Sequence, residues 1–543
     1  MLAKFSRILL LTVSLVCVVV THAVADRYYM DHYYVAPPVV EEDEAVKAAL
    51  ENRYPLPEPT VRAWLGMFMP AVTLPDFVSL KQLAAEAPSH YVAVGRRIDM
   101  EAAQIFDAAK LFDGEGLYLA SVTSPGAFGV RLQVDLMGLR GGERLWLLDA
   151  KGDAVFGPYT ADSALAGGQW LPPTIGDSVV LALQSNDGAL PLMTVNYVSH
   201  FYKPLVEKQL PCNIPIAQDA VTTVQEVSAG VGRLLVAYQS GGQGLCTATL
   251  LNSYQTRGGV PKPYLLSAWH CFGDRVDYES LTIYWDYRRE DADGGDAPNI
   301  YQLPFNRGAD LIAYNVVLDS TLVELNGAVP NGAYGRAWAG WDSQPPALGA
   351  PVQVIHHPMG ADMKTSRGRI TDPEVDVAMG MLGSFRYEKQ IEAVWSAGVT
   401  EQGSSGSALL LRNDSYRISG VLSNGTMHSC TDTSNNLDNF GPFHVFFPQI
   451  GCHLVSGYTC QDPYEPETSR CFLLRKMGLS TETLHHLRMF RDQTLAKTAL
   501  GSKLTQDYYT LAPSFENWVD NSVVLRVALE ALTTVGAAWG SAL

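Results

Sequence analysis

The chain has 543 residues, of which 47% are hydrophobic and 17% charged, and its formal net charge is −17. This composition excludes a mainly disordered chain, and the negative charge argues against nucleic acid as the main partner. The length predicts two to four domains, and the 47 glycines and 25 tyrosines favour a loop-rich, mainly β protein.

Residues 1–25 have the form of a secretory signal peptide. Lys4 and Arg7 precede an apolar run over residues 8–20, and Ala23-Val24-Ala25 is an A-x-A cleavage site. A membrane anchor is the alternative, but the run is too short to span a bilayer comfortably. We therefore expect a secreted protein, either extracellular, periplasmic or on the cell surface, that starts at Asp26.

The cysteine content fits export. Of eight cysteines, Cys17 leaves with the signal peptide and seven remain. Disulfides are the default in exported chains, and an odd number leaves one thiol over or paired with another molecule.

A β-sandwich is predicted over residues 116–205, after an N-terminal pro-region over residues 26–115. Turn residues separate five short apolar or alternating runs, a spacing typical of antiparallel sandwiches. These runs are Leu117–Ala120, Val130–Val134, Leu145–Leu148, Val179–Leu183 and Met193–Val198. No catalytic cluster occurs among them, so we expect a prodomain, a structural unit or a binding unit.

Residues 212–458 again combine short strands with Gly- and Pro-rich loops, and their length suits a double β-barrel. Residues 459–543 change to helical periodicity, as in Leu484, Leu487 and Phe490, and predict a small helical C-terminal module.

Residues 212–458 contain the parts of a nucleophilic serine site, which needs a base, a carboxylate that orients it and backbone N–H groups for the oxyanion. His270 is the candidate base, because it follows the apolar strand Tyr264-Leu265-Leu266. A disulfide from Cys271 to Cys246 would tie its loop to a neighbouring strand.

Asp319 is the candidate for the orienting carboxylate. It begins a D-x-x-L-x-x-L pattern and is expected at the head of a buried strand. Asp286 and Asp310 are competitors that lack this pattern, and we expect both of them in loops.

Ser405 is the candidate nucleophile in the segment Gly403-Ser404-Ser405-Gly406-Ser407. We prefer it to Ser404 and Ser407 because Gly403 lies two residues before it and Gly406 directly after it. The N–H groups of Gly403 and Ser405 could then form an oxyanion hole. The order His, Asp, Ser and the absence of G-x-S-x-G argue against an α/β-hydrolase esterase.

Residues 212–447 resemble the trypsin-like serine proteases, and most closely the bacterial lysyl endopeptidases. The motifs that carry the resemblance are Gly244–Asn252, Ser267–Cys271, Asp319–Leu325, Gly398–Ser407 and Val421–Gly425 followed by Cys430. The resemblance implies two six-stranded β-barrels and peptide-bond hydrolysis through an acyl-enzyme, with no cofactor and no metal.

The resemblance also implies roles for individual residues. Asp438 matches the carboxylate at the base of the S1 pocket, with Asp432 as a rival, and would select Lys or Arg at P1. Ser423 stands where the lysyl endopeptidases have a histidine, so strict lysine preference is not expected and arginine is an expected P1 residue as well as lysine. Cys212 and Cys430 match a family disulfide, which leaves one unassigned pair among Cys452, Cys460 and Cys471.

Two further clusters have simpler interpretations. The acidic segment 291–296 fits a solvated turn better than a calcium loop, because its spacing is not that of an EF-hand. His356 and His357 point to opposite faces of a strand, so a shared metal is not expected and a structural role is.

The flanking regions also resemble parts of exported bacterial proteins. The sandwich is similar to N-terminal regions of secreted proteases and would fold first and block the site, with Lys203 and Lys208 as candidate self-cleavage positions. The helical module resembles a recurrent C-terminal module, for which a sorting or cell-surface partner, or a plain appendage, is expected.

The sequence thus predicts a secreted serine endopeptidase that acts on proteins or peptides, cleaves after Lys or Arg and uses His270, Asp319 and Ser405. The alternative is a protease-like binding or adhesion protein with little catalytic activity.

Overall fold

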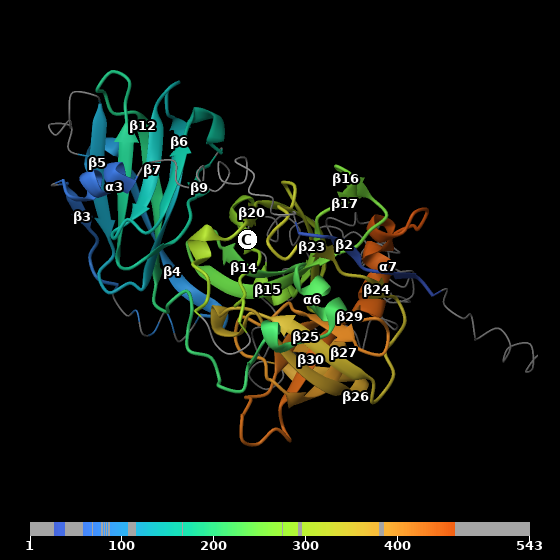
Figure 1. Ribbon diagram of the computed structural model, residues 1–543. Helices are drawn as coiled ribbons and strands as arrows, with labels where there is room; N and C mark the ends of the chain where they lie inside the picture. The colour runs from blue at the N-terminus through green and yellow to red at the C-terminus, as the bar shows by residue number, and fades with distance from the viewer. Residues whose placement is uncertain are drawn as a thin grey trace, which may run out of the picture.

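The computed structural model describes residues 27–37, residues 58–106 without 68, 78–79, 81, 83 and 85–86, and residues 116–461 without 166, 274, 292–295 and 380–384. The predicted signal peptide and nearly all of the predicted C-terminal module lie outside these residues. Two β-rich units, a sandwich and a two-barrel domain, lie side by side (Figure 1). The mainly β class is confirmed. No helix within the described ranges is long and apolar enough to cross a membrane.

The sandwich consists of two sheets with an apolar core between them. One sheet has the order β3-β5-β11-β7-β8, and the other contains β10-β6-β12-β4 with β9 paired to β6. The strands are β3 (Ala71–Thr73), β4 (Tyr91–Glu101), β5 (Leu117–Thr123), β6 (Gly129–Gly138), β7 (Arg144–Asp149), β8 (Val155–Tyr159), β9 (Gln169–Trp170), β10 (Thr174–Ile175), β11 (Ser178–Gln184) and β12 (Leu192–Phe201). All five predicted strands are confirmed, as β5, β6, β7, β11 and β12.

The continuous apolar run in β11 follows from burial on both of its faces. Val179 and Leu181 point into the core between the two sheets. Val180 and Ala182 point to the opposite face, where helix α3 (Glu58–Leu65) contributes Val61 to a second apolar cluster. A strand that is covered on both sides loses the alternation of a half-exposed strand.

Strand β4 joins the sandwich to the two-barrel domain, so the sandwich begins well before residue 116. On one edge β4 pairs with β12 of the sandwich. Its first residues also pair with β15 of the two-barrel domain, with Ala93 opposite Gln243 and Tyr91 opposite Gly244. The two units therefore share one continuous sheet of twelve strands.

The first barrel is open, a half-barrel that follows the pairing path β20-β19-β14-β15-β18-β22-β21. Its strands are β14 (Val231–Ala237), β15 (Gln243–Leu251), β18 (Tyr264–Ser267), β19 (Thr282–Tyr284), β20 (Phe305–Arg307), β21 (Ala309–Asn315) and β22 (Ser320–Leu325). The two ends of this path meet in sequence at Gly308, between β20 and β21.

The second barrel is a closed ring of six strands, because β29 pairs with both β28 and β30. Its strands are β25 (Pro351–His356), β26 (Lys364–Met379), β27 (Phe385–Ala397), β28 (Ala408–Leu411), β29 (Arg417–Gly425) and β30 (Leu437–Pro442). Helix α7 (Phe443–Leu454) follows and packs through Phe443, Phe446 and Ile450 into the core of the two-barrel domain.

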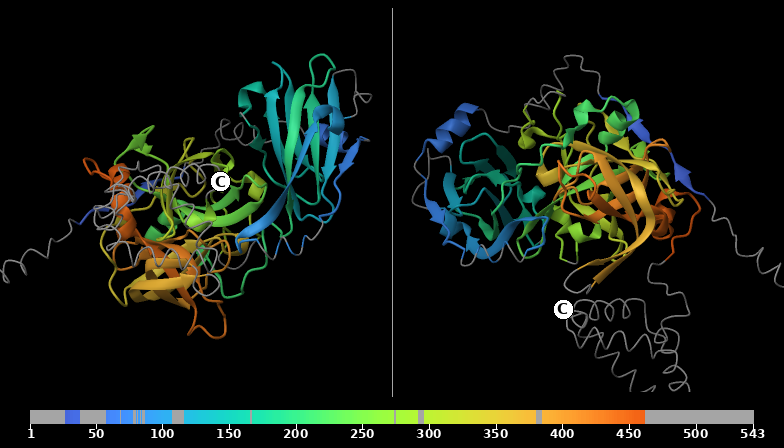
Figure 2. Two further views of the ribbon diagram at one scale, coloured as in Figure 1. Left: turned by 180° about the vertical axis from the view of Figure 1, so that it is seen from behind. Right: turned by 90° about the horizontal axis from the view of Figure 1, so that it is seen from below.

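Residues 27–37 lie on the two-barrel domain, far from the sandwich (Figure 1, Figure 2). Strand β1 (Tyr29–Met30) pairs with β24 (Trp341–Asp342), and β2 (Tyr33–Val35) pairs with β23 (Arg336–Trp338). Arg27 forms an ion pair with Asp342. The predicted pro-region is therefore divided between the two units.

Short elements complete the described chain. They are α5 (Ala102–Ile105), α6 (Thr222–Ser228), β13 (Ile214–Pro215), β16 (Thr256–Arg257), β17 (Val260–Pro261) and the 3-10 turns η1 (Ala161–Ser163), η2 (Ile216–Gln218), η3 (Trp269–Cys271), η4 (Tyr278–Ser280), η5 (Ile300–Gln302) and η6 (Pro358–Gly360).

Candidate active site

His270 lies where the first barrel opens toward the second. Strand β18 ends at Ser267, and the turn η3 carries His270 with 24% of its side chain exposed. The next residue, Cys271, forms a disulfide with Cys246 of β15, with an S–S distance of 1.95 Å. The histidine loop is therefore attached covalently to a barrel strand.

Asp319 holds His270 at two points. Its Oδ1 accepts the backbone N–H of His270 at 2.7 Å, and its Oδ2 lies 2.7 Å from Nδ1 of the ring. The carboxylate is fully buried directly before β22, as the sequence predicted, and its backbone has a φ of 52°, in the left-handed region. This contact places the proton on Nδ1 and leaves Nε2 free to accept another.

The electrostatics of the pair favour the imidazolium form. Burial lowers the pKa of His270, but the negative charge of Asp319 and the hydrogen bond to it outweigh burial and raise the pKa above its usual value. This arrangement stabilises the protonated form of His270, which is the form that a base reaches when it accepts a proton during a reaction.

The competing aspartates are engaged elsewhere. Asp286 lies outside the strands, as expected, and forms a buried ion pair with Arg336 at 3.3 Å. The expectation that Asp310 lies in a loop is wrong. It lies in β21 opposite Glu324. Its side chain is exposed there, so the strand accommodates a charged residue.

Ser405 is the accessible member of the three neighbouring serines. It is half-buried and lines a cleft of about 880 Å³ together with His270. The side chains of Ser404 and Ser407 are fully buried, and the Ser404 hydroxyl lies 2.7 Å from Nδ1 of His356. The loop is held against the first barrel, because the N–H of Thr247 donates to the Ser405 carbonyl at 2.8 Å.

Gly403 lies in the left-handed region of backbone conformation, which favours glycine. Its φ is 87°, and a Cβ there would lie 2.9 Å from the carbonyl oxygen of His357. Among the backbone hydrogen bonds of the described residues, none uses the N–H of Gly403 or of Ser405 as donor. Ser405 lines the cleft, whereas Gly403 is buried beside it and does not belong to its lining.

Asp438 lies in the same cleft, on the inner side of the second barrel. It is in β30, where it pairs with Ala393 of β27 and with Gly425 of β29. Its Oδ2 accepts hydrogen bonds from Trp395 Nε1 at 2.5 Å and from Thr400 Oγ1 at 2.6 Å. The rival Asp432 is exposed and bonds Ser434 within its own loop.

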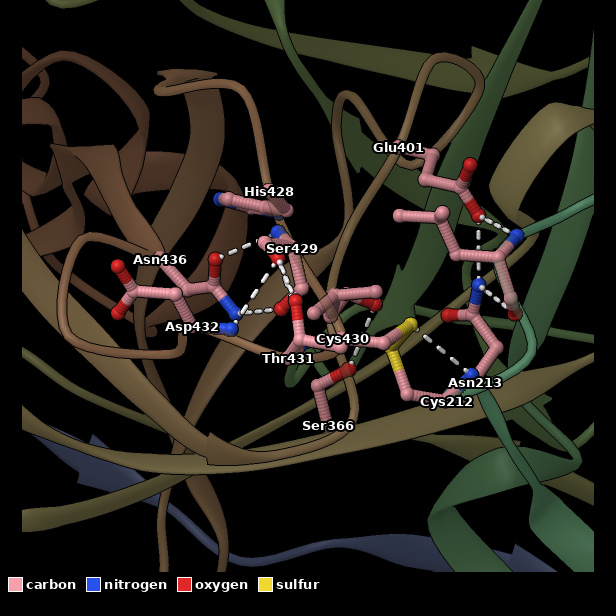
Figure 3. The surroundings of a disulfide bond; sticks show 12 residues. Cys212, Asn213, Ser366, Glu401, His428, Ser429, Cys430, Thr431, Asp432 and Asn436 are labelled. Carbon is pink, nitrogen blue, oxygen red and sulfur yellow. Dashed lines mark hydrogen bonds between the residues drawn. A yellow bond between two sulfur atoms is a disulfide. The ribbon is translucent and has the colours of Figure 1, made fainter.

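The cysteine pairs stabilise the loops around the cleft. Cys212 and Cys430 form a disulfide with an S–S distance of 2.07 Å, which ties the start of the two-barrel domain to the loop between β29 and β30 (Figure 3). Cys452 pairs with Cys460 at 2.11 Å, and Cys471 lies outside the described residues.

Sequence reasoning missed two side chains that contact the carboxylate of Asp319. The Ser423 hydroxyl donates to Asp319 Oδ2 at 2.5 Å, although the sequence marked this residue only as a departure from a family pattern. Tyr387 of β27 also acts on Asp319, since burial and the Asp319 charge raise the pKa of its phenol. No local signal identifies either contact, because β27 and β29 are distant from Asp319 in sequence.

A segment of the pro-region lies in the cleft, which the sequence did not indicate. Pro88, Ser89 and His90 line it beside His270, and the rings of His90 and His270 lie 5.5 Å apart. The N–H of Leu245 in β15 donates to the His90 carbonyl at 2.9 Å. This segment leads directly into β4, whose first residues pair with β15.

The described residues include two clusters with potential metal ligands, Cys246-His270-Cys271 and Cys452-His453-Cys460. In each cluster the two cysteines form a disulfide, so no thiolate is available to a metal. His356 and His357 each use a ring nitrogen inside the protein, toward Ser404 and toward the Ala361 carbonyl. Most of the acidic segment 291–296 lies outside the described residues.

The fold brings His270 and Asp319 from the first barrel and Ser405 from the second to one cleft, an arrangement similar to that of trypsin-like serine proteases. Residues 207–441 match the family model described as the C-terminal domain of lysyl endopeptidase. A lysyl endopeptidase from Pseudomonas aeruginosa is 29% identical over 320 residues, which are 55% of this chain and 66% of that protein. The region is thus similar to lysyl endopeptidases, and the similarity supports a serine endopeptidase that acts on peptides or proteins.

Solved structures of other bacterial serine proteases show weaker likeness. The active form of the Rv3671c protease from M. tuberculosis is 14% identical, with a TM-score of 0.29, and the match covers 47% of this chain and 93% of that one. The thermostable protease AL20 from an extremophilic microorganism is 14% identical, with a TM-score of 0.26 and coverage of 40% and 92%. The description of the fold therefore rests on the strand pairings given above.

Proposed function

We propose that the protein is a secreted serine endopeptidase that cleaves after Lys or Arg, with His270, Asp319 and Ser405 as its catalytic residues. The observation that carries the proposal is a single cleft lined by His270, Ser405 and Asp438. The three disulfides and the similarity to a lysyl endopeptidase support an extracellular protein.

In this proposal His270 Nε2 takes the proton from Ser405 as its oxygen attacks the scissile carbonyl. Asp319 keeps the other ring proton on Nδ1 and stabilises the imidazolium that forms. The N–H groups of Gly403 and Ser405 bind the oxyanion of the tetrahedral intermediate. The imidazolium then protonates the leaving amine, and water hydrolyses the acyl-enzyme by the reverse proton path.

Asp438 supports the preference for a basic P1 side chain. Its carboxylate lies deep in the cleft, held by Trp395 and Thr400, and gives the pocket a negative charge of low solvent exposure. A Cβ on Gly425 would lie 1.8 Å from Asp438 Oδ1, so glycine leaves this oxygen room. Lys and Arg side chains can both pair with a single carboxylate, so we propose that both are accepted at P1.

The test is hydrolysis of peptides with Lys or Arg at P1 by the secreted wild type and by Ser405→Ala. We expect the variant to lose at least about a thousandfold in kcat, because it lacks the nucleophile. Labelling of wild-type Ser405 by a fluorophosphonate, located by peptide mass spectrometry, separates loss of the nucleophile from failure to mature. Equal hydrolysis by both proteins would contradict the mechanism.

We also propose that the N-terminal region acts as a prodomain that blocks the cleft. The segment Pro88–His90 occupies the place next to His270 that a substrate would use. Lys203 and the exposed Lys208 are the proposed self-cleavage positions between the sandwich and Cys212. N-terminal sequencing of the secreted protein tests this, and a single species that begins at Asp26 would contradict it.

The second candidate function is a protease-like binding or adhesion protein. Its support is that the cleft is already partly occupied by the chain itself. Failure of the processed wild type, after separation from its N-terminal region, both to hydrolyse basic peptides and to react with the fluorophosphonate would favour it. The predicted C-terminal module and its sorting or surface partner lie outside the described residues and stay a prediction.

A further inference from the structure

His428 lies on the carboxylate that is proposed to bind the P1 side chain. It is in the loop between β29 and β30 and lines the same cleft as His270 and Ser405. Its Nε2 is 3.2 Å from Asp438 Oδ1, and the two side chains are only 3% and 2% exposed. No sequence pattern distinguishes this histidine from the other eleven.

The two ring nitrogens of His428 have different surroundings. Nδ1 lies 2.7 Å from the carbonyl oxygen of Thr400 and 3.2 Å from the backbone N–H of the same residue, so it faces both an acceptor and a donor. Nε2 faces Asp438 Oδ1 and also the carbonyl oxygen of Leu437 at 3.4 Å. A proton on Nε2 therefore points toward Asp438, and an imidazolium also serves the shorter Nδ1 contact, which is the one with the acceptor.

The surrounding charges agree with this geometry. Burial lowers the pKa of His428, but the hydrogen bond to Asp438, its charge and the two carbonyls outweigh burial and raise the pKa. The other titratable groups that act on His428 are Glu401, in the loop before Ser405, and His356 in β25. Burial lowers the pKa of His356 far below its usual value, so it stays neutral and adds no competing positive charge.

The carboxylate of Asp438 has no oxygen free of protein donors. Trp395 and Thr400 donate hydrogen bonds to Oδ2, and Nε2 of His428 lies 3.2 Å from Oδ1. The first two contacts come from the barrel and its adjoining loop and fix the carboxylate. Only the contact with His428 can be exchanged for a contact with a ligand without breaking the wall of the barrel.

The loop that carries His428 is anchored on its far side. Cys430 is tied to Cys212, and Asn436 bonds both the N–H and the carbonyl of Ser429 at 2.8 and 2.9 Å (Figure 3). The backbone one and two residues after His428 is therefore held. The histidine can leave Asp438 by rotation of its side chain while the loop stays in place.

We propose that His428 is a specificity-determining residue of the S1 pocket, an internal cation that occupies Asp438 in the free enzyme and is displaced by a basic P1 side chain. The inference rests on the proposed role of Asp438. The protonated side chain of His428 and the P1 cation then compete for the carboxylate of Asp438. A neutral P1 side chain does not enter this competition.

The competition has a definite pH dependence. At low pH the imidazolium holds Asp438 and weakens the binding of Lys or Arg, and at high pH the neutral ring yields. The preference for a basic over a neutral P1 side chain therefore rises with pH through the pKa of His428, which lies above the ordinary value of 6.5. Couplings of this kind between two ligands usually amount to about 5- to 150-fold.

The experiment compares kcat/KM for two peptides that differ only in P1, lysine against norleucine, between about pH 5.5 and 9.5, where lysine stays charged. The titration of His270 affects both peptides alike and cancels in their ratio. We expect the ratio to rise at least about fivefold in the wild type and to be independent of pH in His428→Gln. The matched control is His453→Gln, a half-buried histidine at the end of α7, which should keep the wild-type rise.

A flat ratio in the wild type, or the same rise in His428→Gln, would overturn the inference. Asp438→Asn distinguishes this from failure of the proposed function. If that variant keeps its lysine preference, Asp438 is not the P1 carboxylate. If it loses the preference while His428→Gln behaves as the wild type, only the role of His428 fails.

A second measurement does not depend on turnover. The imidazole of His428 is titrated by NMR in Ser405→Ala and in Ser405→Ala with Asp438→Asn. We expect a lower His428 pKa in the double variant, because the carboxylate that stabilises the imidazolium is gone. An unchanged pKa would show that the two side chains are not coupled and would overturn the inference.

Discussion

At the scale of single residues, Asp319 shows what local sequence can and cannot reveal. Its place before a buried strand was predicted from D-x-x-L-x-x-L, and Ser405 was predicted from its glycines, because strand burial and tight turns leave local patterns. The donors from Ser423 and Tyr387 could not be predicted. They arrive where the second barrel lies against the first, because Asp319 directly precedes β22 of the first barrel while β27 and β29 belong to the second, and Ser423 is 104 positions further along the chain.

We expect Ser423→Ala to lower kcat/KM by roughly tenfold, since a hydrogen bond to a charged group contributes about 1.5–3 kcal/mol. Loss of the donor leaves more negative charge facing His270, so the pKa of His270 rises further. Because the neutral ring acts as base, the acid limb of the pH profile of kcat/KM moves to higher pH. The measurement is that profile.

The same strand offers a matched control for this prediction. Ser419 of β29 is also buried, and its hydroxyl has no hydrogen-bond partner among the described residues. Ser419→Ala should leave the acid limb in place, and Ser423→Thr should restore it. If both alanine variants shift the profile equally, the effect belongs to the strand and the Ser423 contact has no special role.

At the scale of elements, β4 differs from the five sandwich strands that the sequence predicted. Its first residues are enclosed by the two-barrel domain, and its last residues alternate on the edge of the sandwich, with Arg97 and Asp99 exposed. Because one half of the strand is buried and the other half alternates between exposed and half-buried positions, the strand lacks the regular alternation by which a sequence predicts a β-strand. The segment that enters the cleft, Pro88–His90, thus leads into an element without a clear pattern.

The contact of this element with the cleft should weaken in acid. Burial, the charge of His270 and that of Lys203 lower the pKa of His90 to about 3, whereas a released segment has the ordinary value near 6.5. Between these values the released state binds a proton that the docked state does not. Docking is therefore fully stable above about pH 6.5 and loses up to about 1.4 kcal/mol per pH unit as the pH falls below it.

Hydrogen exchange of the Tyr91 to Ala93 amides, corrected for intrinsic rates, measures this loss between pH 7.5 and 4.5. Protection should fall with acid in the wild type, and His90→Gln, which carries no titratable ring, should show a weaker dependence. The amides of β11, in the centre of the opposite sheet of the sandwich, serve as an internal reference. Equal slopes in wild type and His90→Gln would mean that His90 does not control docking.

At the scale of the whole molecule, the N-terminal region contacts the two-barrel domain at three separate places. Strands β1 and β2 extend its sheets, β4 extends the first barrel, and an apolar cluster that includes Phe201, Leu235 and Tyr284 joins the two units. Domain boundaries drawn from composition could not reveal this, because the contacts join segments that are distant in sequence. Cleavage at Lys203 or Lys208 would cut one connection and leave all three contact areas intact.

We therefore expect the cleaved N-terminal region to stay bound to the protease domain and to elute with it in size-exclusion chromatography. Arg131 of β6 is the buried polar centre of this interface, where it donates to Gln243 Oε1 at 2.6 Å and to the Ser280 carbonyl at 3.2 Å. Arg131→Ala should weaken the association by about 30-fold or more, because truncation of one partner in such a network costs about 2–5 kcal/mol. The exposed Arg144 of β7 is the matched control, and Arg144→Ala should co-elute as the wild type does. Circular dichroism of each variant shows whether the sandwich still folds, and separation of the two wild-type fragments without denaturant would contradict the prediction.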